Sequence, residues 1–203
     1  MPPALSIAFG EPLPIAPSAE TLRFLARRRS APALALTAPA PNDEETARIL
    51  ALAARAPDHG KLSPWRFVIL RGEAKAAFVK GLEAIAARRP DAAKADAKLG
   101  KIRVPPLTVA VVSHLVPGEI PEWEQQLSAG SVCTLMLIAA QAMGFGANWI
   151  TDWYAYDADA LRLLGVAEDE RVAGFVQIGT AREAPLERVR PDLAAITREW
   201  APG

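Results

Sequence analysis

The stretch WEQQLSAGSVCTLMLIAAQAMGFGANWITD, from Trp123 to Asp152, decides the fold. Its first part, Trp123–Met143, predicts one long helix. The C-terminal half of this helix is apolar nearly all round, which is typical of a buried central helix. The glycines of Gly144-Phe-Gly146 end the helix, and Ala147–Thr151 predicts a short strand directly after them. The central helix therefore leads through a tight turn into a sheet.

Further strands and helices surround this stretch. The run LTVAVVS, Leu107–Ser113, is β-branched and has no breaker, so it predicts a strand that is buried on both faces. The other predicted elements are strands at Arg66–Arg71 and Ala173–Thr180, and helices that begin near Ser18, at the capping box Asn42–Glu45, after Gly72 and at Asp157. The polar segment Arg88–Lys101 predicts a mobile loop or a short helix.

The order of these elements indicates the fold class. Helices and strands interleave irregularly, and no strand is followed by a GxGxxG or P-loop turn, which argues against a Rossmann domain. We therefore expect an α+β domain with a sheet flanked by long helices. We expect a single domain over residues 18–203, preceded by a flexible or surface leader over residues 1–17.

Composition excludes several classes of protein. Lys+Arg and Asp+Glu both number 23, so the chain lacks the basic excess that nucleic-acid binders need. No apolar run approaches the roughly 18–20 residues that span a bilayer, and the proline-broken N-terminus is a poor signal peptide. We expect a cytoplasmic protein that binds neither nucleic acid nor membrane.

Metal and nucleophile chemistry have few candidate residues. One cysteine and two histidines exclude an intramolecular disulfide and argue against a protein-built zinc site. Cys133 lies in an apolar run and is expected to be a core residue. With so few ligand residues we predict no metal site, and the sequence also contains no convincing catalytic triad or carboxylate pair.

Four polar motifs are candidates for ligand binding, and each has two interpretations. Arg27-Arg28-Arg29-Ser30 is either a helix C-terminus whose cations complement the macrodipole, or an anion clamp. The loop APDHGKLSPWRF, with His59 and Ser63, is either a capped turn or a ligand-binding loop at a sheet edge. The turn and strand Gly144–Trp153 are either a plain connection or a close approach to a planar ligand. The tail pair Arg188 and Arg190 is either solvated or a further anion contact.

Together and in this order, these motifs resemble the nitroreductase superfamily. The motifs that carry the resemblance are RRRS, ARAPDHGKLSPWRF, WEQQLSAGSVCTLMLIAAQAMGFGANWITD and VAGFVQIGTAREAP. The resemblance extends from about Leu22 to the end of the chain. Within the superfamily, the chain is most similar to the small bacterial NAD(P)H nitroreductases. It implies a central mixed or antiparallel sheet flanked by helices. It also implies a homodimer with FMN at the subunit interface and the C-terminal tail packed on the partner subunit.

The resemblance also implies roles for individual residues. Arg28, Arg29 and Ser30 would contact the FMN phosphate and ribityl chain, and His59 and Ser63 would contact the flavin of the other subunit. The remaining implied flavin contacts are Thr151, Asp152 and Trp153 along the ring, and Arg188 or Arg190 at the phosphate. The segment implied for the nicotinamide cofactor is Gln141, Ala142, Met143, Gly144, Phe145 and Gly146. Candidates for stabilising the reduced flavin near N1 and C2 are Arg28 or Arg29, and Lys101 or Arg103.

The implied activity is that of an FMN-dependent oxidoreductase. It would use NADH or NADPH to reduce nitroaromatic, quinone or related small acceptors by a ping-pong mechanism. The flavin would carry the chemistry, and the protein would supply binding, orientation and electrostatics. Two alternatives stay open: a flavoprotein of the same fold with dehalogenase or flavin-fragmenting chemistry, and a non-catalytic FMN-binding protein.

Overall fold

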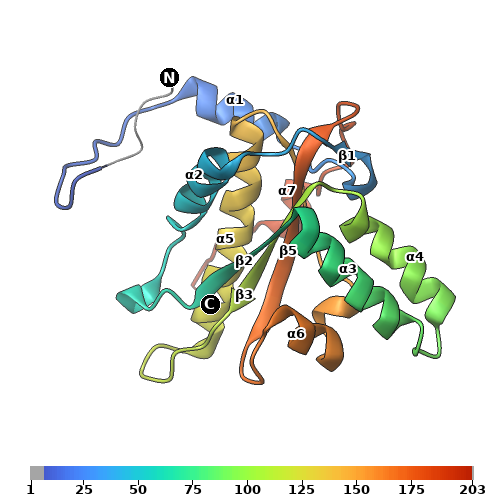
Figure 1. Cartoon of the computed structure of the whole chain (residues 1–203). Helices are drawn as coiled ribbons and strands as arrows, with labels where there is room; N and C mark the ends of the chain where they lie inside the picture. The colour runs from blue at the N-terminus through green and yellow to red at the C-terminus, as the bar shows by residue number, and fades with distance from the viewer. Residues whose placement is uncertain (1–6, 203) are drawn as a thin grey trace.

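A central antiparallel sheet organises the computed structural model, which describes residues 7–202 (Figure 1). The strand order is β1–β5–β3–β2, and β4 also pairs with β5. All four pairings are antiparallel. The strands are β1 (Leu36–Thr37), β2 (Trp65–Arg71), β3 (Leu107–Ser113), β4 (Gly146–Ile150) and β5 (Arg171–Ala181). The expectation of an α+β fold with a central mixed or antiparallel sheet is confirmed, and the sheet is antiparallel.

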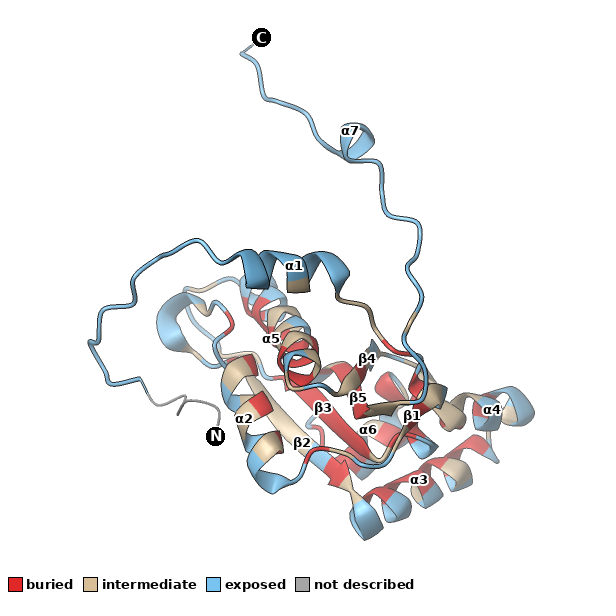
Figure 2. Cartoon of the chain, turned by 90° about the horizontal axis from the view of Figure 1, so that it is seen from above, coloured by how far each residue is buried: buried red, intermediate tan, exposed pale blue. Residues whose placement is uncertain are grey.

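Helices cover both faces of the sheet (Figures 1 and 2). One face packs on α2 (Asp43–Ala53) and α5 (Glu122–Ala142). The other packs on α3 (Gly72–Ala86), α4 (Ala92–Arg103) and α6 (Ala158–Leu164). The outlying helices are α1 (Ala19–Arg27) and the single turn α7 (Leu193–Ile196), and the short 3₁₀ turns are η1 (Ala33–Ala35), η2 (His59–Lys61) and η3 (Trp153–Ala155).

The strand β3 shows why this sequence makes a three-layer domain. Every residue of β3 is buried, as its breaker-free β-branched pattern predicted. Val109 and Val111 point to the layer with α5, whereas Ala110 and Val112 point to the layer with α3 and α4. Each face of the strand therefore supplies a separate hydrophobic core.

Most predicted elements are confirmed, with two differences. The capping box at Asn42 and Glu45 is present, because the Asn42 side chain accepts from Glu45 N at 2.9 Å and Glu45 Oε2 accepts from Asn42 N at 2.9 Å. The segment Arg88–Lys101, predicted as a mobile loop or a short helix, contains most of α4, a helix of 12 residues. The helix α4 buries Leu99 and Ile102 against the core. The two-residue strand β1 was not predicted.

Both ends of the chain are exposed on this protomer (Figure 2). The predicted leader is exposed from Ile7 to Pro17, and its first six residues lie outside the described part. The tail after Arg182 is also mostly exposed, and Ile196 and Trp200 are 67% and 82% exposed.

Within the described residues, no helix is both long enough and apolar enough to cross a membrane.

Lys75 is a buried charge-bearing residue in this fold. It is 6% exposed on α3, and its ammonium donates to the carbonyl of Pro105. Burial lowers the pKa of Lys75 to about 7. Between pH 7 and the usual lysine range the unfolded chain therefore binds more protons than the folded one, so stability rises with pH.

Replacing Lys75 with Met should remove this dependence. Between pH 7 and pH 10, we expect wild type to gain up to about 4 kcal/mol of unfolding free energy relative to Lys75→Met. Urea unfolding at both pH values measures the difference, and groups common to both proteins cancel. Lys80→Met, which changes an exposed lysine on the same helix, is the control. A constant difference between wild type and Lys75→Met would contradict the prediction.

Candidate functional site

A cavity of about 540 Å³ lies between α1, the turn from α5 to β4, and the end of β5. Its lining combines two predicted motifs that are more than a hundred residues apart: the arginine cluster and the turn Gln141–Gly146. Ala181 and Pro185 close it from the start of the C-terminal tail. The structure therefore brings the sequence-predicted phosphate and nicotinamide segments to one cavity.

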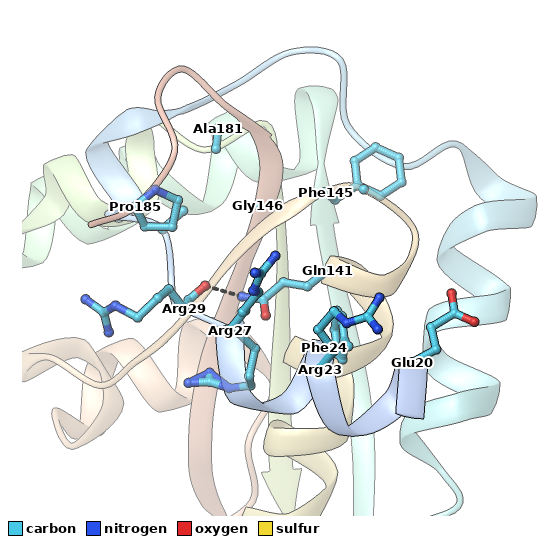
Figure 3. Close-up of a pocket in the computed structure, with 13 residues that line it drawn as sticks. Glu20, Arg23, Phe24, Arg27, Arg29, Gln141, Phe145, Gly146, Ala181 and Pro185 are labelled. Carbon is cyan, nitrogen blue, oxygen red and sulfur yellow. Dashed lines mark hydrogen bonds between the residues drawn. The ribbon is translucent and has the colours of Figure 1, made fainter. Parts of the chain in front are cut away.

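The cavity is strongly cationic. Four arginines line it, Arg23, Arg27, Arg28 and Arg29, against a single carboxylate, Glu20. Figure 3 shows Glu20, Arg23, Arg27 and Arg29 in a row, with the Gln141 side chain beside this row, where it donates to the Arg29 carbonyl. Guanidinium groups bind phosphate and carboxylate through paired donors, so the cavity is suited to an anionic ligand.

The end of α1 determines where the arginines of this row lie. Ser18 caps the helix by accepting from Thr21 N at 3.2 Å. The helix ends at Arg27, and Arg28 has an extended backbone with φ −60° and ψ 134°. Arg28 and Arg29 therefore leave the helix axis and follow the cavity wall.

Three hydrogen bonds fix the segment after α1 to the sheet. Ala31 N donates to the Ala147 carbonyl at 3.0 Å, and Asn148 Nδ2 donates to the Ala31 carbonyl at 2.5 Å. Gln141 Nε2 donates to the Arg29 carbonyl. The segment is thus attached to both α5 and β4, and the arginine side chains project from a rigid backbone. Ser30 lies between these anchors and is partly buried.

Some polar atoms of the cavity remain available to a ligand. Gln141 Oε1 is buried and has no hydrogen-bond partner in the described residues. Such an orphan acceptor is normally satisfied by water or by a ligand donor. Arg29 donates from Nε to the Leu186 carbonyl at 2.8 Å, and its terminal nitrogens have no hydrogen bond within the described chain.

Glycines shape the turn beneath the cavity. Gly144 has a φ of +88°, which favours glycine. A Cβ on Gly146 would lie 2.7 Å from Leu36 Cδ2 and 3.0 Å from Ala181 Cβ, so β4 could not approach its neighbours with a larger residue there. The two glycines allow α5 to turn directly into the sheet.

A second predicted group, the His59 loop, lies elsewhere. His59 Nδ1 is 2.7 Å from Glu124 Oε2 near the start of α5. Because an ionised carboxylate only accepts, Nδ1 carries the proton and Nε2 faces away from this contact. The Asp58 carboxylate accepts from Leu62 N at 3.2 Å and from Ser63 N at 2.7 Å, which holds the loop closed.

This loop has an unusual backbone. Lys61 and Ser63 have φ values of +55° and +49°, in the left-handed region that non-glycine residues rarely adopt. Left-handed conformations of this kind are often found at functional sites.

The two predicted groups lie at opposite ends of α5. Glu124, the partner of His59, and Gln141, on the cavity wall, are about 25 Å apart along the helix axis at 1.5 Å per residue. A single chain therefore does not bring His59 and Ser63 to the arginine cavity.

The third predicted group, Thr151–Trp153, follows β4. Asp152 Oδ2 lies 3.1 Å from Lys101 Nζ and 3.7 Å from Lys98 Nζ, and Oδ1 caps Trp153 N at 2.9 Å. The Trp153 indole donates to the Ala95 carbonyl at 3.0 Å, so its ring packs against α4. Thr151 is exposed.

Lys98 was missed by sequence reasoning. In a helix, residues three apart share a face, so Lys98 and Lys101 would have been recognised as two neighbouring cations. This segment was instead predicted as a mobile loop or a short helix. Lys101 pairs with Asp152, in the segment that the sequence predicted to contact the flavin ring, whereas Arg103 pairs with Glu83 and Asp96.

The tail pair lies beyond the cavity. Arg190 is 2.9 Å from Glu187, and Arg188 is exposed. Neither lines the cavity within residues 7–202, although Pro185, three residues before Arg188, does.

No metal-binding group of three His, Cys, Asp or Glu side chains occurs in residues 7–202. Cys133 is buried, and burial raises the pKa of its thiol to about 12. The expectation that Cys133 is a core residue is confirmed.

The chain is similar in sequence to known proteins. The model of the nitroreductase family matches residues 25–180. The Escherichia coli (strain K12) protein named "Putative NAD(P)H nitroreductase YdjA" is 36% identical over 163 residues, covering 79% of this chain and 88% of the relative.

Solved structures share the fold. A nitroreductase-like family protein from Bacillus cereus has a TM-score of 0.79 at 19% identity, covering 92% of this chain and 98% of its own. The Desulfovibrio desulfuricans protein described as "a putative nitroreductase in complex with fmn" has a TM-score of 0.70 at 21% identity, covering 91% of this chain and 99% of its own.

The contact between His59 and Glu124 can be tested by NMR. In Glu124→Ala the imidazole loses its acceptor, and we expect the neutral ring to shift from the Nδ1–H tautomer toward the Nε2–H tautomer. Imidazole ¹⁵N spectra measure the tautomer. Glu122→Ala, on the same helix, should leave it unchanged. An identical tautomer in wild type and Glu124→Ala would show that the carboxylate does not orient His59.

Proposed function

The chain belongs to the nitroreductase family of enzymes, and from this membership we propose that it is an FMN-dependent oxidoreductase. It would take reducing equivalents from NADH or NADPH and pass them to nitroaromatic, quinone or related small acceptors. Donor and acceptor would use the same cavity in turn, which gives ping-pong kinetics.

The observation that carries this proposal is the cationic cavity between α1 and the turn from α5 to β4. Its volume of about 540 Å³ lies within the range of small-molecule and cofactor sites. Arg28 and Arg29 supply the charge that a phosphate group requires. The orphan Gln141 Oε1 can accept from a hydroxyl donor such as a ribityl chain. The residues present therefore fit FMN.

The relatives support the same cofactors. The similar structure from Desulfovibrio desulfuricans is described in complex with FMN, and the Escherichia coli relative is named for NAD(P)H. We extend both cofactors to this chain because its cavity has the chemistry to hold an anionic flavin.

In the mechanism we propose, FMN supplies the redox chemistry when bound, and the protein residues position it. Arg28, Arg29 and Ser30 would hold the phosphate and ribityl end. Thr151 and the backbone of Asp152 would lie along the ring. Lys98 and Lys101, held by the Asp152 carboxylate, would place positive charge near the same segment, where it favours an anionic reduced ring.

We further propose that the active unit is a homodimer. His59 and Ser63 lie too far from the arginine cavity of their own chain to share its ligand, and they would complete the site of the partner. The exposed apolar residues Ile196 and Trp200 would be covered by the partner subunit. Arg188 or Arg190 would then reach the phosphate with the tail in its docked position.

The arginine pair can be tested directly. The double variant Arg28→Gln/Arg29→Gln should bind FMN at least about tenfold more weakly, because each charge-assisted hydrogen bond contributes about 1.5–3 kcal/mol. Quenching of flavin fluorescence measures the affinity. Arg88→Gln/Arg162→Gln removes the same charge from the exposed surface beside Asp159 and should bind FMN like wild type. Equal FMN affinity in all three proteins would contradict the phosphate-binding role assigned to Arg28 and Arg29.

A mixing experiment tests whether each site is shared between subunits. Arg28→Gln/Arg29→Gln and His59→Ala should each be impaired alone. If each site takes its arginines from one chain and His59 from the other, half of the sites in a mixed dimer are intact. Unfolding and refolding the two variants together should then restore about a quarter of wild-type turnover. No restoration, with mixed dimers verified by mass spectrometry, would place both groups in one chain's site.

A further inference from the structure

Two cavity arginines are not used by the proposed flavin contacts. Arg23 and Arg27 line the same cavity, yet neither makes a hydrogen bond or an ion pair within residues 7–202. Both belong to α1, whereas Arg28 and Arg29 lie beyond its end. Figure 3 shows Arg23 between Glu20 and Arg27, and Arg27 next to Arg29.

The helix itself does not account for this pair. Arg27 lies in the last turn of α1, where a cation complements the macrodipole, but Arg23 lies one turn earlier. The two residues are four apart, so their side chains share a face, and like charges at this spacing destabilise the helix. An anion between them would offset that repulsion.

The surroundings indicate the kind of anion. Phe24, partly buried on the same cavity wall, offers an aromatic ring on which a base can stack. Gln141, Gly144, Phe145 and Gly146, from the segment implied for the nicotinamide cofactor, line the same cavity. An aromatic ring and two unpaired guanidinium groups are the groups that recognise an adenosine carrying an extra phosphate.

Resting on the proposed function, we propose that Arg23 and Arg27 form a second phosphate subsite that binds the 2′-phosphate of NADPH. The enzyme would therefore use NADPH in preference to NADH. Glu20, at the end of the row, is the one carboxylate that could instead bind the free 2′-hydroxyl of NADH. Two arginines against one carboxylate favour the phosphate.

The test uses the FMN-loaded protein. We expect wild type to show a kcat/KM at least about tenfold higher for NADPH than for NADH, since charge-assisted contacts discriminate by about this factor. In Arg23→Gln/Arg27→Gln this ratio should fall toward one, while the FMN content per chain stays at the wild-type value. Arg88→Gln/Arg162→Gln, which changes net charge equally, should keep the wild-type ratio.

Binding to wild type gives a second measurement that requires no variant to fold. Calorimetry of the FMN-loaded protein should find 2′,5′-ADP bound at least about tenfold more tightly than 5′-AMP. Equal affinities, equal use of NADH and NADPH by wild type, or an unchanged ratio in Arg23→Gln/Arg27→Gln would each overturn the subsite. If FMN remains bound and NADH still reduces it, the proposed function stands without this subsite. If no FMN binds, the proposed function itself fails.

Discussion

The site depends on the attachment of one short segment to the sheet. Ala31 exchanges hydrogen bonds with Ala147 and Asn148, and Gln141 holds the carbonyl of Arg29. Arginine side chains are long and flexible, so a cationic cavity is specific only if their backbone is fixed. By joining the end of α1 to the turn from α5 to β4, these contacts create a rigid arginine-bearing wall from residues that are distant in sequence.

Much of the fold could be predicted from sequence because its signals are local. The buried strand β3 is evident from unbroken β-branched residues, and α2 from its capping box at Asn42. The helix α4 was harder, because it buries few side chains, among them Leu99 and Ile102, in an otherwise polar segment. Its lysines pair with a carboxylate because the segment after β4 places Asp152 beside them, which no local pattern reveals.

The candidate site was predictable in parts. The motifs themselves could be identified in the sequence, but their grouping could not. The structure joins the arginine cluster to Gln141 and separates both from His59 by most of the length of α5. That separation follows from the rise of an α-helix, and it gives a physical reason why a site that uses both groups requires two chains. Arg23 could not be singled out from sequence, because an arginine on a short exposed helix has no distinctive local signature.

The most direct measurement is an anaerobic titration with NADPH of the purified protein supplied with FMN, followed by its visible spectrum. We expect each chain to bind one flavin and about one equivalent of NADPH to bleach it, since the bound cofactor accepts the electrons. A protein that takes up no FMN, or whose bound FMN is reduced by neither NADPH nor NADH, would contradict the assignment of the arginine cavity as a flavin site.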